Sequence, residues 1–176
     1  MISVKEFKDR RAKLYKEMDD SSVLILYAGV AKKSSEDDTY DFLANRNFFY
    51  LTNIEQEGSV LLVTKSDNII SEFLFIQEYD ANKEKWTGIR LTSDEACKKS
   101  GITNVLYLNT FDAQLSMILN KKEHVFGYFE KLYLDLDPEL KVADSTTTKE
   151  IMERLHSNYN YLQFLDIYGI ICKLRG

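Results

Sequence analysis

Apolar residues along this chain fall into short runs of strand length, separated by segments in which they recur at helical spacing. At the start, Phe7, Leu14 and Met18 recur at a spacing that places them on one face of a helix. Ser3 and Glu6 have the spacing of a capping box, in which the two side chains satisfy free backbone amides at a helix start. The pattern therefore predicts an opening helix over 4–18.

The chain after this helix, up to its midpoint, consists mainly of predicted strands. The apolar runs are short and rich in Val, Leu, Ile and Phe, and several are apolar on both faces, which is typical of buried strands. These strands are predicted over 22–28, 47–52, 58–65 and 69–76. Ser66, Asp67 and Asn68 supply turn residues between the last two, so those two strands should form a hairpin.

Helices and strands alternate in the second half. Ser93 is expected to cap a short helix, Gly101 to supply the left-handed residue after it, and Thr147 with Glu150 to open a later helix. Helices are predicted over 93–99, 111–119 and 147–156, and strands over 104–108, 124–129 and 161–165, whereas 167–174 fits either. Strands separated by helices require crossover connections. We therefore predict an α/β fold, a mixed β-sheet flanked by helices, in one domain over 1–176.

The composition excludes several classes of protein. Hydrophobic residues make up 44% of the 176 residues and charged residues 29%, which excludes a disordered or membrane-embedded chain. The net charge of -5 argues against nucleic acid as the main ligand. Two cysteines are too few for a disulfide framework, and neither a secretory leader nor a membrane-spanning run is visible, so we expect free thiols and a cytoplasmic protein.

The sequence contains few candidates for catalytic residues. His124 and His156 lie far apart, and the chain has no zinc motif, no Gly-rich phosphate loop and no serine nucleophile elbow. Cys97 is best interpreted as a small buried apolar residue. Asp135 and Asp137 could form a pair of metal-binding carboxylates, but the favoured interpretation is the solvent side of a strand that enters a turn. We therefore predict no catalytic residue and no metal site in this chain.

The only tryptophan, Trp86, stands out because it lies in a polar, turn-forming segment rather than in an apolar run. A large ring in such a place is often a contact residue at an interface or ligand site. The composition alone favours neither interpretation of Trp86, a contact residue or a ring packed against the domain.

Four motifs in order along the chain resemble one known family. The opening has the form Phe-x-x-Arg-Arg-x-x-Leu, the middle carries Asp-x-x-Tyr-x-Phe and Phe-Phe-Tyr-Leu-Thr, and Glu-x-Trp-x-Gly-x-Arg follows. The specific positions are Asp37, Tyr40, Phe42, 48–52, Glu84, Trp86, Gly88 and Arg90. This pattern resembles the N-terminal domain of bacterial aminopeptidase P, a member of the Xaa-Pro aminopeptidase, prolidase and creatinase superfamily. The close of the chain, 166–175, is similar to the link before the catalytic domain of that family.

The resemblance implies an α/β domain of the creatinase and aminopeptidase P type that is itself non-catalytic. A "pita-bread" catalytic domain holding two divalent metals, typically manganese, would follow Gly176. The parent protein would remove the N-terminal residue from peptides with proline in second position. In relatives the domain mediates oligomer contacts, and the tryptophan that matches Trp86 walls the active site of a neighbouring subunit. We accordingly assign Trp86, Asp37, Tyr40 and Arg90 to a substrate-pocket wall or interface.

Several positions depart from the family pattern, and other functions remain open. Leu43 and Ser34 stand where arginine is frequent, Asn53 where glycine is common and Glu57 where proline is frequent. These changes bear on substrate preference and subunit geometry rather than on the fold. The alternatives are a prolidase, which accepts only dipeptides, a peptidase-like binding module without activity, and a creatinase-like enzyme.

Overall fold

The computed structural model describes residues 2–30, 42–78, 90–120, 128–143 and 146–176. Within them, a six-stranded sheet has the order β4-β3-β2-β1-β5-β8. Its strands are β1 (Ser22–Tyr27), β2 (Val60–Ser66), β3 (Ile69–Ile76), β4 (Val105–Tyr107), β5 (Lys131–Leu134) and β8 (Gln163–Asp166). β2 is antiparallel to both neighbours and the remaining pairs are parallel. The predicted mixed sheet is confirmed.

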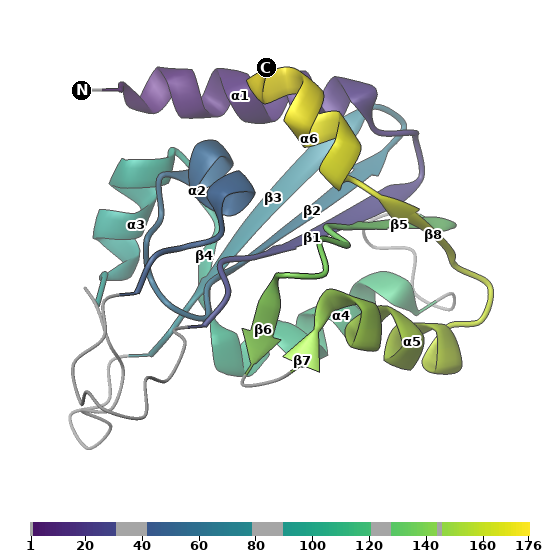
Figure 1. The fold of residues 1–176 in the computed structure, drawn as a ribbon. Helices are drawn as coiled ribbons and strands as arrows, with labels where there is room; N and C mark the ends of the chain where they lie inside the picture. Colours follow the sequence, from purple (N-terminus) through teal and green to yellow (C-terminus); the bar gives the residue numbers. More distant parts are fainter. Residues whose placement is uncertain (1, 31–41, 79–89, 121–127, 144–145) are drawn as a thin grey trace.

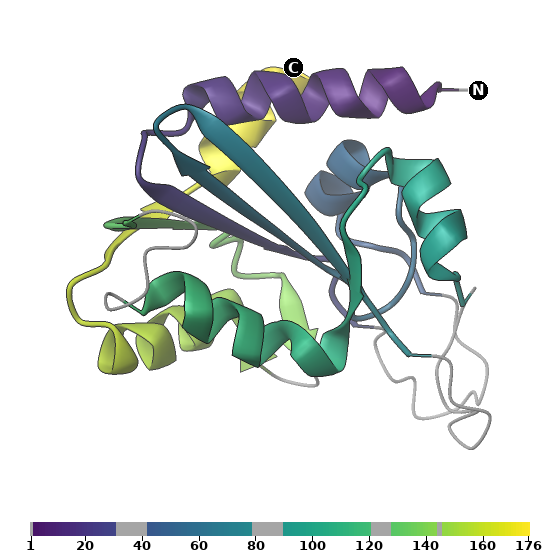
Figure 2. The same ribbon diagram turned by 180° about the vertical axis from the view of Figure 1, so that it is seen from behind.

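Helices cover both faces of this sheet (Figure 1). One face carries α1 (Val4–Glu17), α2 (Arg46–Thr52), α3 (Ser93–Ser100) and α6 (Tyr168–Arg175). The other carries α4 (Phe111–Leu119), which follows the 3-10 turn η1 (Leu108–Thr110), and α5 (Thr148–Asn158). Beside α5 lies a small two-stranded sheet of β6 (Lys141–Ala143) and β7 (Thr146–Thr147). Figure 2 shows the same three layers from behind.

The sheet has an apolar core on each face because its central strands alternate between the two. In β1, Leu24 and Leu26 belong to the core under α1 and α2, whereas Val23 and Ile25 belong to the core over α4 and α5. All four side chains are at most 1% exposed. This double burial explains why the strand is apolar at four consecutive positions rather than at alternate ones.

Polar contacts attach α1 to the rest of that layer and to the hairpin of β2 and β3. Arg11, which is 1% exposed, donates from Nε to Oε2 of Glu72 at 2.6 Å and from one terminal nitrogen to the carbonyl of Leu51 at 2.9 Å. The ammonium of Lys65 donates to the carbonyls of Tyr15 and Met18, both at 2.7 Å. A cation at this position also compensates the partial negative charge of the helix C-terminus.

The predicted strand over 47–52 is wrong, because these residues form α2. The side chain of Asn45 accepts hydrogen bonds from the amides of Asn47 and Phe48, which fixes the first turn of a helix. Asn53 ends the helix in the left-handed conformation at φ 62°. Phe48 and Leu51, three residues apart, are both fully buried. The cap and the tertiary packing override the strand preference of the aromatic run.

Other boundaries also differ from the prediction. Of the strand expected over 124–129, only residues 128–129 are described and they are not in a strand; the strand is β5, which begins at Lys131. Thr92, not Ser93, caps α3. Residues 167–174, whose sequence fitted either a helix or a strand, lie almost entirely in α6. The caps at Ser3 and Thr147, the hairpin and the free thiols of Cys97 and Cys172 are confirmed. No helix among the described residues is long and apolar enough to cross a membrane.

Replacing Gly101 with alanine is expected to lower the free energy of unfolding by about 1–2 kcal/mol. Gly101 ends α3 at φ +77°, and a Cβ there would lie 2.8 Å from the side chain of Lys8 and 3.0 Å from Val4. The matched control is Gly169→Ala in α6, where a Cβ would meet nothing within 4 Å, and where alanine should stabilise the helix. Chemical denaturation of both variants measures the difference, and equal effects would contradict the assignment of Gly101.

Candidate functional site

Of the four residues that the family resemblance assigns to a site, the structure places one. Arg90 is half-buried and lies just before Leu91 and α3. Asp37, Tyr40 and Trp86 lie outside the described residues. That these four side chains come together stays a prediction, and the structure describes the framework on either side of the segments that carry them.

The segments that carry these residues follow β1 and β3, which end at the same end of the sheet. β1 and β3 run in the same direction on either side of β2, and the register aligns Tyr27 with Val60 and Val60 with Phe75. Residues 31–41 come after β1 and 79–89 after β3. The two segments thus join the described part of the chain at the carboxyl ends of parallel strands. In α/β sheets this edge is where ligands bind.

Buried polar side chains gather at these strand ends, and no sequence motif indicates them. Gln56, Glu57, Ser59 and Gln77 are each at most 6% exposed. Both amide atoms of Gln56, the hydroxyl of Ser59 and Nε2 of Gln77 have no hydrogen-bond partner in the structure as described. Buried polar atoms are nearly always paired, so unpaired ones point to a ligand or partner. Gln56 and Gln77 belong to none of the family motifs, so only their burial in the structure reveals them.

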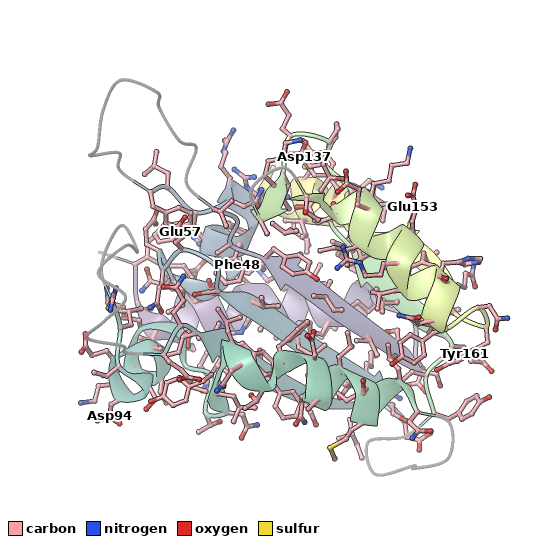
Figure 3. The ribbon with its side chains drawn as sticks, turned by 90° about the horizontal axis from the view of Figure 1, so that it is seen from below. Phe48, Glu57, Asp94, Asp137, Glu153 and Tyr161 are labelled. Carbon is pink, nitrogen blue, oxygen red and sulfur yellow. The ribbon has the colours of Figure 1, made fainter. Side chains whose placement is uncertain are left out.

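The backbone around these side chains is closely held. The amide of Gly58 donates to the carbonyl of Gly29 at 2.9 Å, and the amide of Ala28 donates to the carbonyl of Ser59 at 2.9 Å. The loop before β2 is therefore fixed against the chain that leaves β1. The edge is a rigid base rather than a loose surface, as a binding site requires. Glu57 of this loop is labelled in Figure 3.

Asp135 does not face solvent, contrary to the expectation for Asp135 and Asp137. It is 1% exposed and accepts hydrogen bonds from Nδ2 of Asn47 at 3.2 Å and from the amide of Asp137 at 3.1 Å. Burial raises the pKa of its carboxyl above the ordinary value of 3.8. Arg175 donates to Oδ1 of the same Asn47 at 2.7 Å. Asp135 thus helps hold α2 and α6 at the end of β5, which is a structural role.

A cavity of about 450 Å³ between α1 and the hairpin of β2 and β3 is a weaker candidate. Arg11, Lys65 and Glu72 line it together with Lys8 and Lys16. The buried charges already bond one another or the backbone of α1 and α2, as described above. Their contacts are sufficient to explain them as attachments of α1 to the sheet.

Comparison with known proteins decides the family. The family described as "Aminopeptidase P, N-terminal domain" matches residues 7–126, which is more than half of the chain. The chain belongs to this family. Its fold agrees: a structure of a putative aminopeptidase P from Bacillus anthracis superimposes on 99% of the chain with a TM-score of 0.86 and 33% identity, over 40% of that protein.

Individual relatives agree with the family assignment. An Xaa-Pro aminopeptidase of Haemophilus influenzae is 28% identical over 97% of this chain and 36% of its own length. The Xaa-Pro aminopeptidase of Escherichia coli is 32% identical over 71% of this chain and 29% of its own length. The Escherichia coli aminopeptidase P in its low-pH form superimposes with a TM-score of 0.71 and 26% identity. This aminopeptidase P N-terminal domain thus spans well under half of the relatives it matches.

The described residues of this aminopeptidase P N-terminal domain do not fit a metal site. Among them, no group of three or more His, Cys, Asp and Glu side chains could hold a metal ion. No step of metal chemistry is therefore assigned to them. The prediction that the metal ligands lie outside this chain stays a prediction.

Proposed function

We propose that this chain is the non-catalytic N-terminal domain of a metal-dependent Xaa-Pro aminopeptidase, an enzyme that removes the N-terminal residue before proline. A catalytic domain that holds two divalent metal ions, with manganese as the expected metal, would follow Gly176. The observation that carries the proposal is the similarity to proteins named Xaa-Pro aminopeptidase over most of the chain. The parent would act in the cytoplasm, and the net charge of -5 is in keeping with a peptide rather than a nucleic acid as ligand.

The contribution of this domain would be a wall and a contact surface. Trp86, with Asp37, Tyr40 and Arg90, would line part of the substrate pocket or an interface between subunits of a homo-oligomer. The rigid edge at the ends of β1 and β3 supports this role, because both segments that carry these residues begin there. Such a wall positions the peptide and excludes water without touching the bond that breaks.

α6 supports the proposed connection to a catalytic domain. Its backbone carbonyl at Leu174 accepts a hydrogen bond from the Tyr50 hydroxyl at 3.4 Å, and the guanidinium of Arg175 lies 5.7 Å from the centre of the Tyr50 ring. The guanidinium of Arg10 lies 4.1 Å from the same ring centre. Cation–π contacts with two arginines tie α6 to α1 and α2. A chain that continued past Gly176 would therefore leave from a fixed helix.

The test compares this chain with the protein encoded by the complete reading frame. With manganese, the complete protein should release the first residue from Xaa-Pro dipeptides and from longer Xaa-Pro peptides, whereas the 176-residue chain should release none. Cleavage of dipeptides alone would identify a prolidase. Absence of cleavage by a folded, metal-loaded protein would favour the binding module. Turnover of a guanidino compound in place of peptides would favour the creatinase-like enzyme, and each of these three results would overturn the proposal.

In the complete protein, Trp86→Ala should lower kcat/KM for long Xaa-Pro peptides by about tenfold, which corresponds to the loss of one well-packed contact. Tyr107→Ala is a matched control, because Tyr107 is an aromatic side chain that is 46% exposed on β4. Peptidase kinetics of both variants measure the effect. Equal losses would show that Trp86 has no special place at the pocket.

A further inference from the structure

A groove of about 330 Å³ lies on the face of the sheet that α4 and α5 cover, between these helices and the small sheet of β6 and β7. Figure 1 shows where these elements lie. Its walls are mainly apolar: Val60, Leu108, Phe111, Leu115, Ile151 and Leu155. Volume and lining are those of a site for a small molecule. The groove is separate from the cavity under α1, which lies on the opposite face.

Two opposite charges stand on facing helices of this groove. Asp112 is on α4 and Arg154 on α5, and both side chains line the groove and are exposed. Neither forms an ion pair within 4.0 Å with any residue that the structure describes. Both lie close enough to the hydroxyl of Tyr27 to influence its pKa, which burial raises first, Asp112 raises further and Arg154 lowers. All three side chains line the groove, so its walls combine apolar residues with three polar groups.

A further polar group lies beside this groove, at the carboxyl end of β3. Gly58 lines the groove at φ +79°, and a Cβ there would lie 3.0 Å from Nε2 of Gln77. Gln77 is 6% exposed, and this Nε2 has no acceptor among the described residues. The glycine thus leaves a buried, unpaired donor directly behind the wall of the groove. A buried donor without an acceptor is costly unless a ligand completes it.

We propose that this groove binds a small zwitterion with an apolar side chain, which is the chemistry of a free apolar amino acid or an apolar dipeptide. Arg154 pairs with the carboxylate of the ligand and Asp112 with its ammonium, while Leu115 and Leu155 contact its side chain. The assignment rests on charge complementarity: a zwitterion can form ion pairs with both Asp112 and Arg154, whereas a ligand with one charge can pair with only one of them. It goes beyond the proposed peptidase function and does not depend on it.

The experiment titrates the 176-residue chain with leucine and follows backbone amide shifts by NMR. We expect shifts in β1, α4 and α5 with a dissociation constant on the order of 1 mM, because so small a ligand makes few contacts. Isocaproate, which lacks the ammonium, and isoamylamine, which lacks the carboxylate, should each bind at least about fivefold more weakly. Leucyl-leucine distinguishes the two sources of the zwitterion: tighter binding than leucine identifies the dipeptide, and weaker binding the amino acid.

Variants separate the charges from the groove itself. Asp112→Asn and Arg154→Gln should each weaken leucine binding by about fivefold, and Ala143→Leu, which adds side-chain volume to the wall on β6, should abolish it. Glu153→Gln is the control, because Glu153 is exposed on α5 and does not line the groove. The proposal is overturned if the folded chain does not bind either zwitterion at ten times the expected constant, if isocaproate binds as well as leucine, or if Glu153→Gln weakens binding as much as Arg154→Gln.

Discussion

The variant Phe48→Ala is expected to lower the free energy of unfolding by about 4 kcal/mol. Phe48 is fully buried in the core between the sheet and α1, and Leu51, one helical turn later, is buried beside it. Truncation to alanine removes the apolar contacts and leaves a cavity that the rigid surroundings fill only in part. Denaturation in urea, followed by circular dichroism, measures the change.

Phe49→Ala is the matched control for this prediction. The neighbouring ring is 37% exposed and forms an edge-to-face pair with the ring of Phe7, with ring centres 6.4 Å apart, so its loss should amount to about 1 kcal/mol or less. The companion variant Leu51→Ala should resemble Phe48→Ala. In a strand, by contrast, Phe49 and Leu51 would share one face and respond alike. A large loss for Phe49→Ala together with Leu51→Ala would therefore contradict the helix.

Arg11→Met is expected to lower the free energy of unfolding by about 3 kcal/mol. Methionine keeps most of the apolar stem of the buried side chain but removes the donors to Glu72 and to the carbonyl of Leu51. The carboxylate of Glu72 keeps its hydrogen bond from the Tyr15 hydroxyl but loses its counter-charge. The cost arises mainly from leaving that carboxylate without a cation, rather than from the intrinsic strength of the ion pair.

Two further variants separate these causes. Lys13→Met changes an exposed cation on the same helix and should alter stability by less than about 0.5 kcal/mol. The double variant Arg11→Met with Glu72→Leu should recover a large part of the loss, because no charge is then left unmatched. Thermal and urea denaturation of the wild type, Arg11→Met, Glu72→Leu and the double variant completes the cycle. A double variant less stable than Arg11→Met alone would show that the ion pair itself supplies the stability.

Local signals account for the parts of the fold that the sequence predicted correctly. The cap that Ser3 forms on the amide of Glu6 and the turn at Asp67 and Asn68 act within a few residues, and the structure has both. α2 was missed because a run of aromatic residues favours a strand when its environment is unknown. Asn45 and Asn53, at the two ends of α2, were the local signals that could have corrected the prediction.

The candidate site depends on long-range contacts, and sequence patterns alone could not supply them. Asp135 was expected at the surface, but its partner Asn47 lies far away in the sequence and buries it. Gln77 lies beside Gly58 only because β2 and β3 pair in this register. The family motifs located Trp86 and its companions along the chain, and their arrangement in space stays a prediction.

The two outer strands of the sheet restrict how copies of this domain can associate. β4 has three residues and β8 has four, so both strands that border the six-stranded sheet are short. Short edge strands of this kind commonly prevent the sheets of separate molecules from pairing edge to edge. A homo-oligomer built from this domain should therefore be held by side chains of helices and loops, and not by continuation of one sheet into the next.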